Sequence, residues 1–339
     1  MDSGDIVTTN PKIKKLYIYP VKSFKGISIS QGILTERGLA IPNINRNQSL
    51  DRLWCVCDTD GYVQDIRVQP YFSTIAVSID YKNCNLVLTS TLDIDREDFE
   101  PLTLPINMED DNSSNMVHVS DRYKNYWYGH PLNGINCGIE ASKWITKFIH
   151  KHNKFTYEQK FLFVRYQQNS NRRMKKMFKG KSDIAKRAMP NDQAAFADCS
   201  PYHLVSTESL MDLNRRLPDS ASCERPVSVF RFRPNIEVQY TKQPYDEDFW
   251  MTFRIGNANF RQLGPTGRCV IPTTSPSNGA RYDDEEPRAT LMKYRPLPYG
   301  DGPHGGPTLG IWVAPQKNVI QIVNIGDEIV DCGNDQQKL

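Results

Sequence analysis

The chain has 339 residues, of which 39% are hydrophobic and 10% aromatic, enough to bury a substantial core and to exclude a wholly disordered protein. Its 42 lysines and arginines nearly balance 39 aspartates and glutamates, and the net charge of +3 is too small to indicate a nucleic-acid-binding protein. No apolar run approaches the roughly 18 residues of a membrane helix, so we expect no transmembrane segment.

Short strands are predicted along the first part of the chain, where β-branched and aromatic residues recur between turn signals. They cover residues 13–20, 53–57, 74–80 and 85–89. A helix is predicted over 140–150, whose apolar residues fall on one helical face. Two acidic and polar stretches, 93–100 and 109–114, indicate loops.

The second part of the chain again mixes strands with few helices. A helix is predicted over 206–217, where leucines recur at helical spacing and Ser206 or Thr207 can cap the N-terminus. Strand patterns cover 227–238, 253–255, 269–273 and 319–330. This order of elements predicts an α+β fold with two β-barrel-like modules and a few helices, not the regular strand–helix alternation of a doubly wound sheet.

Residues 171–187 form a strongly basic segment, with eight lysines and arginines and a single acid, Asp183. Such a segment is usually a solvated loop. The alternative is a docking face for an acidic partner or an anionic ligand, and the sequence leaves both interpretations open.

Eight cysteines are spread through the chain, and Cys55 and Cys57 are the only close pair. The polar and acidic first ten residues lack the features of a signal peptide, so we expect a cytoplasmic protein with reduced thiols. No CxxC or HExxH motif indicates a zinc site. Most of the cysteines are therefore expected to be small buried side chains, with one or two left for chemistry.

Two segments carry groups that suit an anion. Lys22 and Ser23 follow the first predicted strand, where an ammonium, a hydroxyl and free N–H groups can bind phosphate, although an ordinary turn looks the same. Arg233 precedes Pro234, which is expected to hold it extended. Beside the Asn235 amide its guanidinium suits bidentate recognition of an anion, or else pairs with an internal carboxylate.

A third segment ends in a thiol. Cys269 follows a glycine-containing turn and stands directly after Arg268, where positive charge and N–H groups are expected to favour the thiolate. Thiolate is the form that a nucleophile or a soft-metal ligand requires. A purely structural cysteine is the alternative.

In their order and spacing these segments resemble the MOSC proteins, a family that handles molybdenum cofactor. The resemblance runs from about residue 13 to residue 330. Its motifs are YPVKSFKG at 19–26, DRLW at 51–54, ADCSP at 197–201 leading into LVSTESLMDLN, FRPNI at 232–236, RC at 268–269 and IGD at 325–327. No single motif is specific, but the six follow the family's order.

Within that family the layout most resembles the amidoxime-reducing components. The resemblance implies an N-terminal β-barrel-like domain over 11–135, a connecting helix over 136–160 and a MOSC domain over 161–332. It also implies a molybdenum–molybdopterin cofactor (Moco), with Cys269 as the protein ligand of the metal. Thiolate sulfur suits a metal that is already bound by a dithiolene.

The same resemblance implies further site residues. The pterin and its phosphate are expected to be held by Lys22, Ser23, Arg52, Ser200, Arg233 and Asn235. Asp198 and Cys199 match the loop that lines the metal, and Asp198 is expected to be catalytic together with Cys269. Arg268 is expected to contribute backbone N–H contacts and positive charge to the cofactor.

The implied activity is a two-electron reduction of small N-hydroxylated substrates, with electrons from a b-type cytochrome, a haem protein, and its reductase. A cofactor-binding or carrier protein without turnover stays open, as does a specialised biosynthetic enzyme on the same scaffold. The chain departs from the family at Thr266, where many relatives have cysteine, and at Gly267, which is often serine. Cys199 stands where threonine is common and would place a second thiol near the metal.

Overall fold

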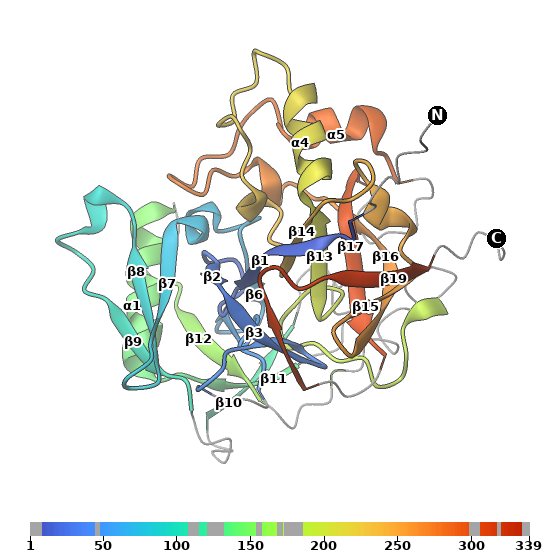
Figure 1. The fold of residues 1–339 in the computed structure, drawn as a ribbon. Coiled ribbons are helices and arrows are strands. Elements are labelled where there is room, and N and C mark those ends of the chain that lie inside the picture. Colours follow the sequence, from blue (N-terminus) through green and yellow to red (C-terminus); the bar gives the residue numbers. More distant parts are fainter. Residues whose placement is uncertain are drawn as a thin grey trace, which may run out of the picture.

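The computed structural model describes residues 9–44, 48–107, 115–120, 132–153, 158–167, 172, 186–297, 306–316 and 320–333. In this part of the chain strands dominate, and the α-helices α1, α4 and α5 lie at the periphery (Figure 1). The predicted α+β class with β-barrel-like modules is confirmed. The predicted loop at 109–114 and the basic segment 171–187, apart from Arg172, Lys186 and Arg187, lie outside the described residues.

The largest sheet has eight strands and draws on both ends of the chain. Their order is β19 (Ile329–Gly333), β15 (Thr252–Ile255), β16 (Ala258–Gly267), β17 (Thr308–Pro315), β13 (Tyr202–Ser206), β14 (Ile236–Gln239), β1 (Lys12–Ile18) and β2 (Ile27–Ile29). Strand β1 pairs antiparallel with β14, with Leu16 opposite Ile236. The first strand therefore belongs to the sheet of the C-terminal half, which brings the turn after it against that half.

A second sheet has five strands and closes on itself. Their order is β10 (Met116–Val119), β11 (Leu132–Asn136), β12 (Phe161–Tyr166), β5 (Trp54–Asp58) and β6 (Val63–Gln64). The ring closes because the Val63 N–H donates to the Ser120 carbonyl at 2.9 Å. All five residues of β5 are buried, as expected of a strand that is covered on both faces.

Two three-stranded sheets complete the fold. One has the order β18 (Gln321–Asn324), β3 (Gln31–Thr35) and β4 (Gly38–Ala40), and the other β7 (Ile75–Asp80), β8 (Asn85–Ser90) and β9 (Leu102–Pro105). The second of these lies beside α1 (Figure 1). Short 3₁₀ turns connect the elements: η1 (Pro70–Thr74), η2 (Asp93–Asp95), η4 (Val229–Arg231), η5 (Asp246–Phe249) and η6 (Ile271–Thr273).

Both predicted helices are confirmed, and each begins at a residue suited to that place. Helix α1 (Ile139–His152) starts after Gly138, whose φ of +104° favours glycine. Helix α4 (Thr207–Arg216) is capped by Ser206, whose hydroxyl accepts the Ser209 N–H at 3.1 Å. Helix α5 (Arg288–Tyr294) had no prediction and stands near α4 in Figure 1.

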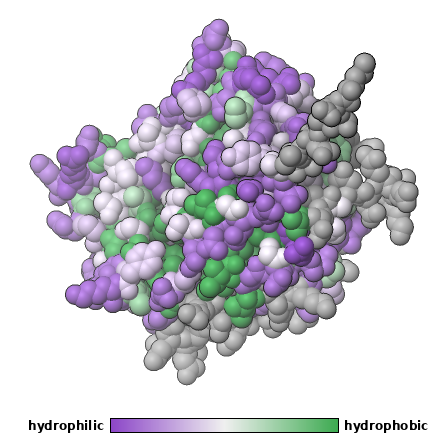
Figure 2. All heavy atoms as spheres, viewed as in Figure 1, coloured by the Kyte–Doolittle hydropathy of each residue, from purple (hydrophilic) through white to green (hydrophobic). Residues whose placement is uncertain are grey.

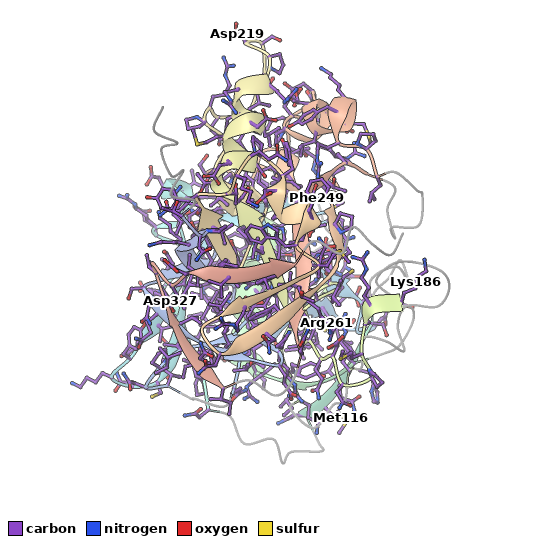
Figure 3. All side chains as sticks on the ribbon, turned by 45° about the vertical axis from the view of Figure 1, so that its right-hand side comes forward. Met116, Lys186, Asp219, Phe249, Arg261 and Asp327 are labelled. Atoms are coloured by element: carbon purple, nitrogen blue, oxygen red, sulfur yellow. The ribbon has the colours of Figure 1, made fainter. Side chains whose placement is uncertain are left out.

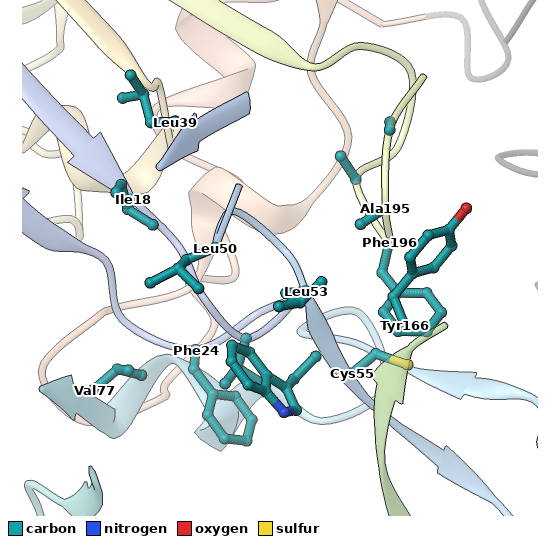
Figure 4. Close-up of a cluster of buried hydrophobic side chains, with 14 of the residues drawn as sticks. Ile18, Phe24, Leu39, Leu50, Leu53, Cys55, Val77, Tyr166, Ala195 and Phe196 are labelled. Atoms are coloured by element: carbon teal, nitrogen blue, oxygen red, sulfur yellow. The ribbon is translucent and has the colours of Figure 1, made fainter. Parts of the chain in front are cut away.

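The main hydrophobic core joins the sheets of both halves, and two smaller clusters lie beside it. Figure 4 shows part of it, where Phe24 and Leu53 pack near Cys55. Cys55 and Cys57 are fully buried, as expected for cysteines that act as small apolar side chains. On the outside, polar residues cover most of the face in Figure 2, with small hydrophobic patches between them.

Two of the predicted strands are shorter than the pattern indicated. In 227–238 only β14 is a strand, because the Ser228 hydroxyl accepts the Phe230 N–H at 3.3 Å and starts the turn η4. The segment 319–330 splits into β18 and β19, which join different sheets. Gly326 forms the turn between them with a φ of +94°, a backbone conformation that glycine adopts readily.

Candidate functional site

The turn after β1 brings Lys22 against a loop that is far away in sequence. The Lys22 ammonium donates to the Phe196 carbonyl at 3.1 Å and forms an ion pair with Asp198. Ser23 adopts a left-handed φ of +75°, and its hydroxyl accepts the Ile66 N–H at 3.2 Å. The structure therefore brings Lys22 and Asp198 together. The hydroxyl of the next residue, Ser23, is bonded to the backbone at Ile66.

Asp198 is an ionised carboxylate surrounded by positive charge. Burial tends to raise its pKa, but the charges of Lys22 and Arg67 outweigh burial and hold the pKa at about 2. The Arg172 guanidinium adds a third positive charge and donates to the carbonyls of Ala195 and Asp198, each at 2.6 Å. Arg172, the first basic residue of the segment 171–187, is thus buried and fixes the loop that carries Asp198.

Cys269 lies after β16, where a strand over 269–273 was predicted; that prediction was wrong. The chain instead forms the 3₁₀ turn η6, in which the Thr273 N–H donates to the Val270 carbonyl at 3.0 Å. Pro272 has no N–H with which to continue a strand ladder. The turn leaves the Cys269 side chain half-buried.

Arg268 was expected to favour the Cys269 thiolate, and the structure shows an attraction between the two charges. The Arg268 guanidinium points inward and donates to the carbonyls of Phe232 and Leu309, at 3.0 and 3.1 Å. Its backbone N–H donates to the Pro307 carbonyl at 2.7 Å. Burial raises the pKa of Cys269, and the Ile271 N–H and the charge of Arg67 only partly oppose this rise.

Arg52 and Asn235 meet in a hydrogen-bonded cluster around Asp51. Arg52 pairs with Asp51 and donates to the Asn235 side chain at 3.3 Å and to the Arg233 carbonyl at 3.0 Å. The Asn235 amide donates to Asp51 at 2.9 Å and accepts the His203 N–H at 3.2 Å. We call Asp51, Arg52 and Asn235 the Asp51 cluster. Asp51 is the acceptor that both Arg52 and Asn235 share, although the sequence analysis assigned no role to this residue.

Arg233 is not extended, as had been predicted from Pro234. Its φ is +56°, because its N–H closes onto the Val229 carbonyl at 3.3 Å at the end of η4. This turn directs one nitrogen, Nη1, to the Phe24 carbonyl at 2.7 Å. The other nitrogen, Nη2, is buried without a partner among the residues that the structure describes. Burial, helped by the nearby charge of Arg52, lowers the pKa of Arg233 to about 10.

Arg233 lines a cavity of about 370 Å³ between the two halves of the chain. Its walls consist of Tyr19, Lys25, Gly26, Ile66, Ser73, Ser228, Phe230, Arg231, Arg233, Ile271, Thr274, Pro276 and Ser277. The Thr274 hydroxyl is a second buried polar group without a partner in the described part of the chain. Buried donors that lack a partner are costly, so this wall is suited to an anionic ligand.

Ser200 and Cys199 are packed inside the protein. The Ser200 hydroxyl donates to the Val313 carbonyl at 3.1 Å and accepts the Tyr202 N–H at 3.1 Å. Cys199 is only 1% exposed, and burial raises the pKa of its thiol. Neither side chain lines the cavity.

Sequence reasoning missed Arg67, which acts on both Asp198 and Cys269. Its guanidinium forms an ion pair with Asp65, and Nε lies 3.0 Å from both carboxylate oxygens. Asp65 directly follows β6, and Arg67 stands two residues later. Two opposite charges at the end of a strand were the signal in the sequence that could have indicated them. In the described part of the chain, no group of three or more His, Cys, Asp or Glu residues is placed to hold a metal ion.

A second ionic cluster lies at β16. Arg261 pairs with Asp192 and donates to the Arg187 carbonyl at 2.9 Å, which ties the end of the basic segment to β16. Figure 3 shows Lys186 on the same side of the molecule as Arg261. The described ends of the segment 171–187 are therefore bound to the protein by Arg172 and Arg187.

Comparison with known proteins identifies the family. The model of the MOSC N-terminal beta barrel domain matches residues 10–152, and that of the MOSC domain matches residues 191–330. The chain belongs to the MOSC family. Relatives named for amidoxime reduction match over most of the chain.

Three of these relatives illustrate the similarity. Mitochondrial amidoxime reducing component 2 of Rattus norvegicus is 31% identical over 284 residues, which are 84% of this chain and 72% of the relative. The Bos taurus protein of the same name is 29% identical, over 94% of this chain and 82% of the relative. Mitochondrial amidoxime-reducing component 1 of Homo sapiens is 30% identical, over 84% and 72%. No helix in the described part of this chain is long and apolar enough to cross a membrane.

Proposed function

We propose that the chain is a molybdenum cofactor-dependent oxidoreductase that reduces N-hydroxylated, amidoxime-type substrates, with Cys269 as the molybdenum ligand. The observation that carries the proposal is the cavity of about 370 Å³, which includes Ile271, two residues after Cys269. Buried nitrogen and oxygen atoms of Arg233 and Thr274 on its wall have no partner among the described residues. The names of the relatives supply the substrate class.

The residues present fit an anionic pterin cofactor. Arg233, Thr274 and the half-buried Lys25 would hold its phosphate, because an arginine fork and a lysine are the usual phosphate-binding cations. Cys269 would supply one sulfur ligand, which suits a soft metal that is already bound by sulfur. When bound, the cofactor supplies two-electron redox chemistry at molybdenum.

The remaining site residues would orient the substrate. With a pKa of about 2, Asp198 is ionised at neutral pH and acts as a hydrogen-bond acceptor, not as a proton donor. A carboxylate in this position would accept the N–H or O–H groups of an N-hydroxylated compound. Lys22 and Arg172 keep that carboxylate in one place, because they bind the loop 195–198 through its carbonyls.

The electron donor belongs to the same proposal. Turnover requires two one-electron transfers, which a b-type cytochrome and its reductase would supply. The basic segment 171–187 stays a candidate docking face for such an acidic partner.

Three further points also remain predictions: the cytoplasmic location, the domain boundaries at residues 135 and 161, and the roles of Ser23, Ser200 and Arg268 at the cofactor.

Metal and pterin analysis of the purified full-length protein tests the proposal. We expect about one molybdenum and one pterin per chain, and reduction of a benzamidoxime-type substrate with a chemical electron donor. Cys269→Ser is expected to abolish reduction, because the metal loses its protein ligand. Cys84→Ser is the matched control, since Cys84 is also a half-buried thiol but lies in the turn between β7 and β8.

Each outcome separates the candidate functions. Wild-type protein without molybdenum and pterin would exclude both the reductase and a cofactor carrier. Protein that contains the cofactor but reduces no N-hydroxylated substrate would favour the carrier. Equal activity of Cys269→Ser and Cys84→Ser would show that Cys269 is not the ligand.

A further inference from the structure

The hydroxyl of Tyr19 is a buried polar group without a hydrogen-bond partner in the part of the chain that the structure describes. Tyr19 directly follows β1 and lines the cavity beside Arg233. Its side chain is 0% exposed, and its Oη has no hydrogen-bond partner among the residues that the structure describes. Burying a hydroxyl in this way is unfavourable unless a ligand completes the hydrogen bond.

The surrounding residues hold the Tyr19 ring firmly in place. The guanidinium carbons of Arg52 and Arg233 lie 4.6 and 4.3 Å from the ring centre, which is the range of cation–π contacts. Gly26 also lines the cavity and packs against the ring. A Cβ added at Gly26 would come within 2.4 Å of Tyr19 Cε1. Only glycine fits there, so the ring and its hydroxyl are confined.

The hydroxyl is a proton donor in this environment. Burial raises the pKa of Tyr19, and the charges of Arg233 and Arg52 oppose that rise without cancelling it. Tyr19 therefore keeps its proton near neutral pH. Together with the unpartnered Nη2 of Arg233, it gives this wall of the cavity two buried donors that suit the oxygens of an anion.

We infer that the Tyr19 hydroxyl donates a hydrogen bond to the anionic group of the cofactor, beside Nη2 of Arg233. Tyr19 is then a cofactor-binding residue that the motif 19–26 did not assign. The inference rests on the proposed function, since it requires that the cavity takes up the pterin cofactor.

A pair of tyrosine variants tests the inference with two readouts that do not depend on activity. Tyr17 is the matched control: it is 1% exposed and lies two residues earlier, but its hydroxyl donates to Glu237 at 2.7 Å. Tyr19→Phe and Tyr17→Phe are prepared without cofactor, from a host that cannot make the pterin, and with cofactor. The melting temperature of the cofactor-free protein and the half-life of pterin release are measured.

The two variants are expected to respond in opposite ways. Cofactor-free Tyr19→Phe should melt at the wild-type temperature or about 2–4 °C above it, because an unpaired buried hydroxyl is removed. Its pterin should be released about tenfold faster, as expected for the loss of a hydrogen bond to a charged group. Tyr17→Phe should melt below wild type and release pterin at the wild-type rate.

Two results would overturn the inference alone. One is an unchanged pterin half-life in Tyr19→Phe, measured in a protein whose wild type holds the cofactor. The other is a cofactor-free Tyr19→Phe that is destabilised as much as Tyr17→Phe, because this would reveal a protein partner of the hydroxyl. Wild-type protein without pterin would instead overturn the proposed function and the inference with it.

Discussion

The Asp51 cluster and the wall of the cavity are built from the same segments, yet they treat polar groups in opposite ways. Arg233 and Asn235 are two residues apart. The Asn235 side-chain nitrogen donates to Tyr17 and Asp51, and its oxygen accepts from Arg52 and His203. Arg233 leaves Nη2 without a partner in the described part of the chain.

The difference separates scaffold from binding surface. A buried polar network whose members are all bonded makes a region rigid and fixes its geometry. Buried donors without partners destabilise the folded protein and are retained where a ligand completes them. On this basis we propose that Asn235, which the sequence placed on the cofactor, supports Arg52 and Asp51 instead, and that Arg233, Tyr19 and Thr274 bind the ligand.

Removing the carboxylate of the Asp51 cluster is expected to have the largest effect on stability. Asp51 is 1% exposed, pairs with Arg52 and accepts the Tyr19 N–H at 2.9 Å. Asp51→Ala leaves the partly buried Arg52 guanidinium without its counterion and should lower the free energy of unfolding by about 3 kcal/mol. Urea denaturation of the cofactor-free protein measures this loss.

Asp219→Ala is the control for this experiment, because Asp219 is fully exposed and pairs with Arg225 at the surface. It should leave the urea midpoint almost unchanged. Similar midpoints for the two variants would contradict the view that the Asp51 cluster is a scaffold.

Local pattern was sufficient to predict many of the elements of the fold. Helix α4 followed from leucine spacing and the Ser206 cap, and β5 from its apolar run. The family resemblance followed from ordered motifs. The first signal depends on residues that are close in the sequence and the second on the order of motifs along the chain, so neither required knowledge of the folded chain.

The pairing of distant residues could not be predicted in the same way. Lys22 and Asp198 are 176 positions apart, and only the folded chain shows that they form an ion pair. The strand prediction over 269–273 failed because Pro272 favours a turn over a ladder. Arg233 was expected to be extended from Pro234, but its N–H bond to Val229 outweighed that local preference.

A buried carboxylate extends the comparison to the effect of pH on stability. Glu247 is 0% exposed, and the donors that bond it among the described residues are neutral, the Ser206 N–H at 3.2 Å and the Ser209 hydroxyl at 2.8 Å. Burial, with the nearby charge of Asp248, raises the pKa of Glu247 to about 7. Between about pH 4.5 and 7 the folded protein therefore keeps a proton that the unfolded chain has released.

Stability should accordingly fall as the pH rises through this window, by a little over ~1 kcal/mol per unit and by about 3 kcal/mol in total. Glu247→Gln removes the titrating group and should remove this part of the slope. Unfolding free energies of both proteins at pH 5, 6, 7 and 8 give the comparison. Parallel pH profiles of the wild type and Glu247→Gln would mean that Glu247 does not cause the fall in stability with pH.

The smallest expected change in stability gives the most specific test, because it compares two neighbouring hydroxyls. Thr273 and Thr274 are both buried. The Thr273 hydroxyl donates to the Val270 carbonyl at 2.7 Å, whereas the Thr274 hydroxyl has no partner among the described residues. In the cofactor-free protein Thr273→Val should cost about 1 kcal/mol, and Thr274→Val should cost nothing or stabilise the fold.

With the cofactor bound, Thr274→Val should release pterin faster than wild type, because the Thr274 hydroxyl then has a partner to lose. Thr273→Val should release it at the wild-type rate, since its hydrogen bond lies within η6. Melting temperatures and pterin half-lives of both variants measure these differences. Equal destabilisation by the two valines in the cofactor-free protein would mean that Thr274 is bonded like Thr273. The distinction between scaffold and binding surface would then fail at this wall.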